Sequence, residues 1–294
     1  MDSELKNKFD ISKLDESLTY FQTILKQIKD IQTSISNYNL ELENNNYPLT
    51  LKLLPKIEDK LKKFSQTQQK FPELKIEFLE NYFSQINSWI SNEKNLKPKK
   101  RQHYVDSFFN QMGDHFKSCN LPLNGHNPTF SSKNFKFILD SNKLKINIVY
   151  GGDEEKMHLF DGLSLTDVSS TIKNFYEYFD KLELSLELKI IHDCYLQCIQ
   201  KNNQSTGEWI LINDIMKSYV EEKSKSQLKL QYPDRIHFSF LIFKIFKSEI
   251  LYENKRIGKR TATHSAAVNK NEHIWLPLGT DDLMGENIMY LNFN

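Results

Sequence analysis

RIHFSFLIFKIFKSEIL (Arg235–Leu251) lies in the last third of the chain and decides how that third is interpreted. Its length favours a helix, although its Phe and Ile content also fits a buried strand. The segments around it complete an ordered series: a helix over Leu184–Lys201, a short strand over Glu208–Ile212, a helix capped by Asn213, the quoted helix, and extended stretches at Lys255–His264 and His273–Leu278. This order predicts a winged-helix-like module.

The apolar character of this helix argues against a DNA-reading role. At about 100° per residue, His237, Lys244 and Ser248 form only a narrow polar strip. A recognition helix needs several polar side chains that face the major groove. We therefore expect this helix to dock onto protein.

Direct DNA contact is the alternative function of the same module. Five cations follow the apolar helix and could contact phosphates without reading bases: Lys255, Arg256, Lys259, Arg260 and Lys270.

The composition excludes several classes of protein. The 294 residues carry a net charge of only +1, so no global basic field attracts nucleic acid or membrane. No run is long and apolar enough to span a membrane, and three cysteines without a signal-peptide pattern fit the cytoplasm. The chain has 9 glycines and neither a Walker A nor a GxGxxG pattern, so we expect no nucleotide and no other cofactor.

The first 97 residues predict a helical arm. Apolar residues from Ile11 onwards follow heptad-like steps of three and four, with one extra three-residue step: Leu14, Leu18, Phe21, Leu25, Ile28, Ile31 and Ile35. Further helices are expected over Leu49–Lys70 and from Pro72, the latter with an apolar stripe from Ile76 to Ile90. The arm either closes on its own core or packs against a partner.

A cationic run, Lys94–Arg101, follows the arm. Such runs hold phosphates or act as import signals, but we interpret this one as a solvated loop that leads into a helix over Lys99–Ser118. We place a domain boundary before Pro98.

The middle of the chain predicts a small antiparallel sheet. Phe135–Leu139, Leu144–Tyr150 and Met157–Phe160 are separated by turn residues and should form a three-stranded meander. A helix over Leu163–Leu182, capped by Ser164 or Thr166, should cover one face.

Two groups of residues suggest a catalytic site or a metal site. Asp140, Glu154 and Lys156 are similar to the acid and lysine set of a metal-dependent nuclease, although a hairpin tip is also an ordinary place for charges. A zinc site is the second idea, because two pairs have i,i+4 spacing on predicted helices: His115 with Cys119, and Cys194 with Cys198. Buried cysteines that act as small apolar residues are the simpler interpretation.

We thus expect a mainly helical α+β protein with three parts. These are a helical bundle or coiled-coil arm over 1–97, a connector over 98–183 and a winged-helix-like domain over 184–294. The expected function is that of a non-enzymatic subunit that docks to protein partners, accessory to a DNA-acting or phage-defence complex. Direct DNA binding is the alternative, and a metal-dependent nuclease is the third interpretation.

Overall fold

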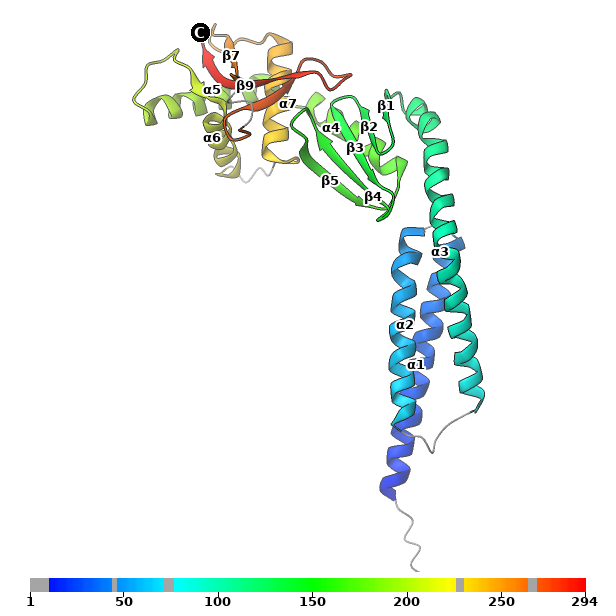
Figure 1. Ribbon diagram of the computed structural model, residues 1–294. Helices are drawn as coiled ribbons and strands as arrows, with labels where there is room; N and C mark the ends of the chain where they lie inside the picture. Colours follow the sequence, from blue (N-terminus) through cyan, green and yellow to red (C-terminus); the bar gives the residue numbers. More distant parts are fainter. Residues whose placement is uncertain (1–10, 44–46, 71–76, 226–229, 264–268) are drawn as a thin grey trace, which may run out of the picture. The chain divides into compact units, whose positions relative to one another are not determined.

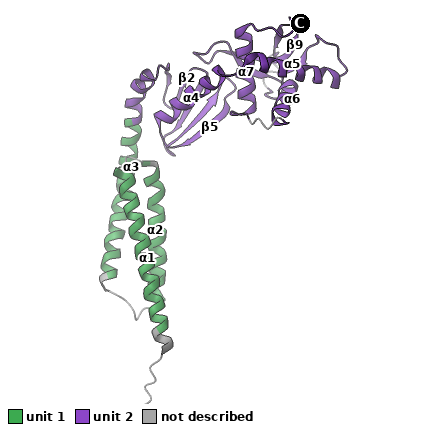
Figure 2. Ribbon diagram, turned by 180° about the vertical axis from the view of Figure 1, so that it is seen from behind, with its two compact units in different colours: residues 1–107 green, residues 108–294 purple. Residues whose placement is uncertain are grey.

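The computed structural model describes residues 11–43, 47–70, 77–225, 230–263 and 269–294. The chain is a mixed α+β protein with N-terminal helices and antiparallel sheets, as the sequence predicts. It divides into two compact units, residues 1–107 and residues 108–294 (Figure 2). No helix among the described residues combines the length and the apolar character that a membrane crossing requires.

Unit 1 is a bundle of three helices, α1 (Ile11–Glu43), α2 (Tyr47–Gln69) and the first part of α3 (Glu77–Ser118), which lie side by side in Figure 1. Its core includes a stacked pair, Phe64 on α2 and Phe83 on α3, with ring centroids 3.7 Å apart. Tyr38 on α1 donates a hydrogen bond of 2.6 Å to Glu93 on α3. Apolar packing and a few buried polar contacts therefore hold the three helices together.

The expected loop at Lys94–Arg101 is wrong, because α3 continues through this run with Pro98 inside it. Two of the five cations form ion pairs: Lys94 pairs with Glu58, and Lys100 lies 2.7 Å from Glu93. The Tyr47 hydroxyl also donates to the Lys97 carbonyl. The run is therefore a charged helix face. The predicted helix start at Pro72 and the stripe residue Ile76 fall outside the described residues.

Unit 2 begins with a five-stranded antiparallel sheet in chain order, β1 (Asn124–His126), β2 (Thr129–Ser132), β3 (Phe135–Asp140), β4 (Lys145–Tyr150) and β5 (Glu155–Asp161). The three predicted strands are confirmed, and β1 and β2 extend the sheet. Alternate residues of β3 are buried, as expected for a sheet with one covered face.

Helix α4 (Leu165–Asp180) is the predicted covering helix. Its cap is Ser164, whose hydroxyl accepts a hydrogen bond of 3.2 Å from the Asp167 amide. Phe175 on its buried face meets Phe135 of the sheet edge to face, at 4.9 Å between ring centroids. The buried face of α4 therefore packs against the sheet, and it also includes Val168, Ile172 and Phe179.

The remaining elements follow in the order α5 (Leu184–Lys201), β6 (Ile210–Leu211), α6 (Ile212–Lys225), α7 (Asp234–Ser248), β7 (Ile257–Thr261), β8 (Ile274–Pro277) and β9 (Gly285–Phe293). Strand β9 lies between β6 and β7, and its first residues also pair with β8. The alternative in which the quoted apolar stretch forms a strand is wrong, because α7 is a helix.

Candidate docking surface

Helix α7 is part of the core of unit 2, so the expectation that it forms a docking surface is wrong. Phe238, Phe240 and Leu241 are at most 1% exposed. Two residues of its polar side are also unavailable to a partner, because His237 is buried at 1% exposure and Lys244 forms an ion pair of 2.6 Å with Asp180. The apolar face of the helix is therefore available neither to a partner protein nor to a DNA groove.

Helix α1 carries the exposed apolar surface of the bundle. Leu18, Phe21 and Leu25 are 57%, 42% and 54% exposed, and Ile28, one turn further on, is half-buried. The four residues follow steps of three, four and three, so they form one continuous stripe along the helix. We call Leu18, Phe21, Leu25 and Ile28 the α1 strip.

Leu18, Phe21 and Leu25 of the α1 strip are distinct from the face of α1 that packs in the bundle, whereas the half-buried Ile28 also packs against the bundle core. The buried face consists of Tyr20, Ile24, Ile31 and Tyr38, all at most 4% exposed. At 3.6 residues per turn the two faces lie about 100° apart. Figure 1 shows the first turns of α1 extending beyond the ends of α2 and α3. The apolar residues that follow heptad-like steps from Leu14 to Ile35 therefore belong to two different faces of α1. Leu18, Phe21 and Leu25 are not core residues.

One flank of the α1 strip bears exposed charges. Asp15, Gln22 and Lys29 are all exposed and succeed one another at intervals of seven residues. This spacing places them along a single line beside the strip. The surface therefore combines an apolar stripe with an acidic side chain near one end and a basic side chain near the other.

The five predicted DNA-contacting cations lie in or near the last sheet, and most have protein partners. Arg256 lies 3.5 Å from Glu249, and Lys259 forms an ion pair with Glu286. The Arg260 guanidinium lies over the Trp209 ring at 4.1 Å, and the Lys270 ammonium donates to the Asp153 carbonyl. Lys255 joins Tyr252 through a pair of backbone hydrogen bonds. Carboxylates thus already offset part of this positive charge.

The four residues of the predicted zinc set do not form a metal site. His115 and Cys119 are close, with Nε2 and Sγ 3.8 Å apart, but His115 also lies 3.0 Å from the Ser169 hydroxyl. Cys194 and Cys198 are buried on α5, and burial raises the pKa of the Cys194 thiol to about 11. No group of three or more His, Cys, Asp or Glu among the described residues could hold a metal ion.

The predicted nuclease set is also separated by the sheet register. Asp140 pairs with Lys145 at one end of β4, whereas Glu154 precedes Glu155, which pairs with Tyr150 at the other end. Asp140 accepts hydrogen bonds from the Lys143 and Asn142 amides, which lower its carboxyl pKa. Asp140 is the last residue of β3, Glu154 lies in the turn before β5 and Lys156 lies within β5, so Asp140 and Glu154 do not come together and the nuclease arrangement does not form.

A buried polar cluster between α5, α6 and α7 was not predicted from the sequence. Glu187 accepts hydrogen bonds of 2.7 Å from Tyr219 and 2.6 Å from Lys223. His237 Nε2 lies 3.4 Å from the Tyr219 hydroxyl, and burial lowers the pKa of His237 to about 4. The i,i+4 spacing of Tyr219 and Lys223 is the only sequence signal for this cluster. Glu187, Tyr219 and Lys223 are buried and satisfy one another, whereas the buried His237 Nδ1 has no hydrogen-bond partner among the described residues. The paired groups indicate a structural role.

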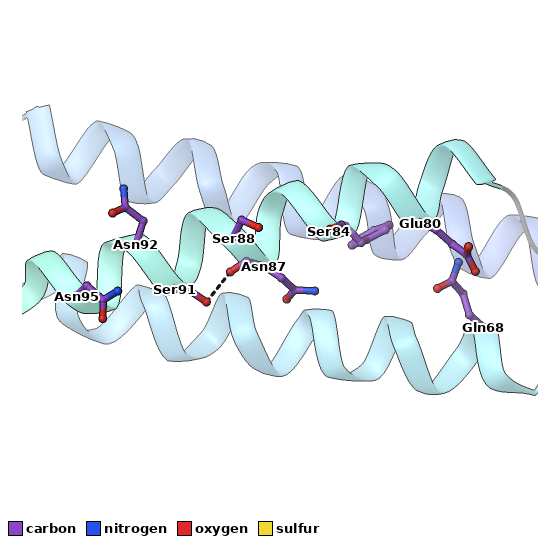
Figure 3. A pocket seen from close by; sticks show the side chains of 9 residues that line it. Gln68, Glu80, Ser84, Asn87, Ser88, Ser91, Asn92 and Asn95 are labelled. Atoms are coloured by element: carbon purple, nitrogen blue, oxygen red, sulfur yellow. Dashed lines mark hydrogen bonds between the residues drawn. The ribbon is translucent and has the colours of Figure 1, made fainter.

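A cleft of about 710 Å³ runs along α3 in unit 1, lined largely by serine and asparagine side chains. Figure 3 shows Ser84, Asn87, Ser88, Ser91, Asn92 and Asn95 along the helix, with Glu80 and Gln68 at one end. Ser91 donates to the carbonyl of Asn87 at 2.9 Å. Glu80 is the only titratable residue in the lining. The lining therefore lacks a nucleophile paired with a base.

Comparison with known proteins gives no relative: no family model, curated protein or solved structure matches this chain.

Proposed function

We propose that this chain is a non-enzymatic, cytoplasmic docking subunit of a larger assembly and that it docks through the α1 strip. The observation that carries the proposal is the exposure of Leu18, Phe21 and Leu25 along one side of a long helix. An apolar stripe with a charged flank is the surface that a helical partner recognises. The three cysteines are free thiols, the state that a reducing cytoplasm maintains.

A winged-helix-like identity for the C-terminal elements is part of the proposal. The element order from α5 to β9 and the strand order β6–β9–β7 support it. Because α7 is core, this module would serve the assembly through its outer surfaces and through β7 and β8, which we call the wing. An assembly that acts on DNA, such as a phage-defence complex, suits such a module.

Quantitative affinity capture from nuclease-treated native cells tests the docking function. The tagged wild type is compared with Leu18→Asp/Leu25→Asp, which places charge in the α1 strip. Leu40→Asp is the matched control, because Leu40 is 53% exposed on the same helix but outside the strip. We expect the strip variant to lose a protein that the wild type and Leu40→Asp retain. Equal recovery of every captured protein by all three chains would contradict the proposal.

Direct DNA binding by the wing is the second candidate. It is favoured by the exposed Arg260 of β7, whose guanidinium lies over the half-buried Trp209 ring in a cation–π pair. Neutralising Lys255, Arg256, Lys259 and Arg260 should then abolish binding to a labelled duplex in fluorescence anisotropy. Four lost phosphate contacts correspond to about 3–4 units of the log–log salt slope. Neutralising Lys62 and Lys63 on α2 is the control, and an equal loss in both variants would argue against the wing.

A further inference from the structure

We infer that the occupant of the α1 strip is a second copy of this chain, paired with α1 antiparallel. This inference rests on the proposed docking function and specifies its partner. The inference depends on the fact that the strip can pair with a second copy of itself. Both the spacing of its apolar residues and the charges on its flank match when the second copy runs in the opposite direction.

The apolar spacing of the strip matches itself in reverse. The steps of three, four and three between Leu18, Phe21, Leu25 and Ile28 read the same from either end. In an antiparallel pair of helices, Leu18 would pack opposite Ile28 of the second copy, and Phe21 opposite Leu25. The two-fold axis repeats both contacts, so the strip forms four apolar layers with no unmatched residue.

The charges on the flank select this antiparallel arrangement. In that register, Asp15 of one copy lies within two residues, about 3 Å along the axis, of the position opposite Lys29 of the other. Symmetry provides this attractive pair twice and brings Gln22 next to its own copy at the centre. All three side chains are exposed on one line of α1, so they can make these contacts.

A parallel pair would leave the same charges without partners. In a parallel coiled coil, the flank that bears Asp15 and Lys29 faces the opposite flank of the other helix. On α1 that opposite flank consists of Ser17, Ile24 and Ile31, which carry no charge and of which both isoleucines are buried in the bundle. The charge pattern therefore favours the antiparallel pair.

Sedimentation equilibrium of the full chain tests the inference through charge reversal. We expect the wild type to form dimers, and Leu25→Asp to weaken the dimer by more than about a hundredfold. Asp15→Lys alone or Lys29→Asp alone places like charges together twice and should weaken it on the order of tenfold. The double variant Asp15→Lys/Lys29→Asp restores both attractive pairs and should recover the wild-type dissociation constant.

Mixing the two single variants gives the sharpest result. One chain then carries lysine at both positions and the other carries aspartate at both, so each inter-chain pair is attractive and a heterodimer should form. Circular dichroism checks that every variant is folded. A monomeric wild type, or single reversals that neither weaken the dimer nor rescue one another, would overturn the inference. If the chain is monomeric while strip variants still lose a captured protein, the docking function stands and the second copy is the wrong partner.

Discussion

Lys223 on α6 lies 2.6 Å from Glu187 on α5, in an ion pair whose side chains are only 10% and 8% exposed. The Tyr219 hydroxyl donates to the other carboxylate oxygen of Glu187 at 2.7 Å, so the carboxylate is satisfied from two directions. A buried charge that loses its partner is far more costly than a buried pair that is absent altogether.

Lys223→Met should therefore destabilise unit 2 by about 3–5 kcal/mol, because it leaves the Glu187 carboxylate without its counter-charge. Glu187→Gln/Lys223→Met removes both charges and keeps an acceptor for Tyr219, so it should cost clearly less than the single change. Urea unfolding followed by the fluorescence of Trp209 and Trp275 measures both. A single variant within about 1 kcal/mol of the wild type would show that the pair is not coupled to the fold.

The second prediction concerns the pH dependence of stability. Burial, and then the charge of Lys223, lower the pKa of His237 to about 4 in the folded chain, against 6.5 for an ordinary histidine. Between these two values the unfolded chain binds a proton that the folded chain does not. The free energy of unfolding should therefore fall by up to about 3 kcal/mol as the pH drops from 6.5 to 4.

His237→Gln removes this titration and is the matched comparison. Urea unfolding of both chains at several pH values between 4 and 7 isolates the histidine, because the carboxyl groups they share cancel in the difference. The variant should show the shallower dependence. Parallel curves for the two chains would contradict a depressed His237 pKa.

The third prediction concerns the close approach of Gly285 to Trp275. A Cβ added at Gly285 would meet the Trp275 ring, and one added at Gly152 would lie 2.8 Å from the ring nitrogen. Gly285→Ala should consequently cost about 1–3 kcal/mol through overpacking. Gly279→Ala is the control, because nothing lies within 4 Å of its added Cβ. In thermal unfolding, Gly285→Ala should have a lower melting temperature than Gly279→Ala. Equal melting temperatures would contradict the packing around Trp275.

The fourth prediction separates the two faces of α1 through adjacent residues. Ile24 is 3% exposed and Leu25 is 54% exposed. Ile24→Ala should destabilise unit 1 by about 2–5 kcal/mol, whereas Leu25→Ala should change its folding stability by less than about 0.5 kcal/mol. Urea unfolding under conditions that keep the chain monomeric, followed through Trp89, measures the difference. Similar losses in the two variants would mean that the α1 strip is buried.

Periodicity and turn chemistry predicted much of the fold. The strands β3 to β5, the Ser164 cap and the covering helix α4 depend on local alternation and capping, which a sequence displays directly. The continuity of α3 through Pro98 could not be predicted, because Glu58 of α2, which pairs with Lys94, becomes a neighbour of this run only in the bundle.

The docking surface could be predicted from the sequence only in part. The seam from Leu14 to Ile35 identified α1 as amphipathic, but periodicity does not say which stripe of a helix meets its own bundle. The extra three-residue step between Ile28 and Ile31 is where the seam passes from the α1 strip to the buried face. The zinc and nuclease sets failed for a related reason: spacing along the chain does not determine which helices or strand ends meet.

Cysteine cross-linking across the proposed two-fold axis tests the central claim most directly. In a Cys119→Ser background, Asp15→Cys and Lys29→Cys are oxidised separately and as a mixture of the two full-length chains. We predict a disulfide-linked dimer from the mixture, whereas neither variant alone should cross-link, because in the proposed register its two thiols lie about 24 Å apart along the axis for Asp15→Cys and about 18 Å apart for Lys29→Cys. Gln22→Cys, at the centre, should cross-link to itself. Efficient cross-linking of Asp15→Cys and Lys29→Cys each to itself, or none in the mixture, would contradict the antiparallel pairing of α1.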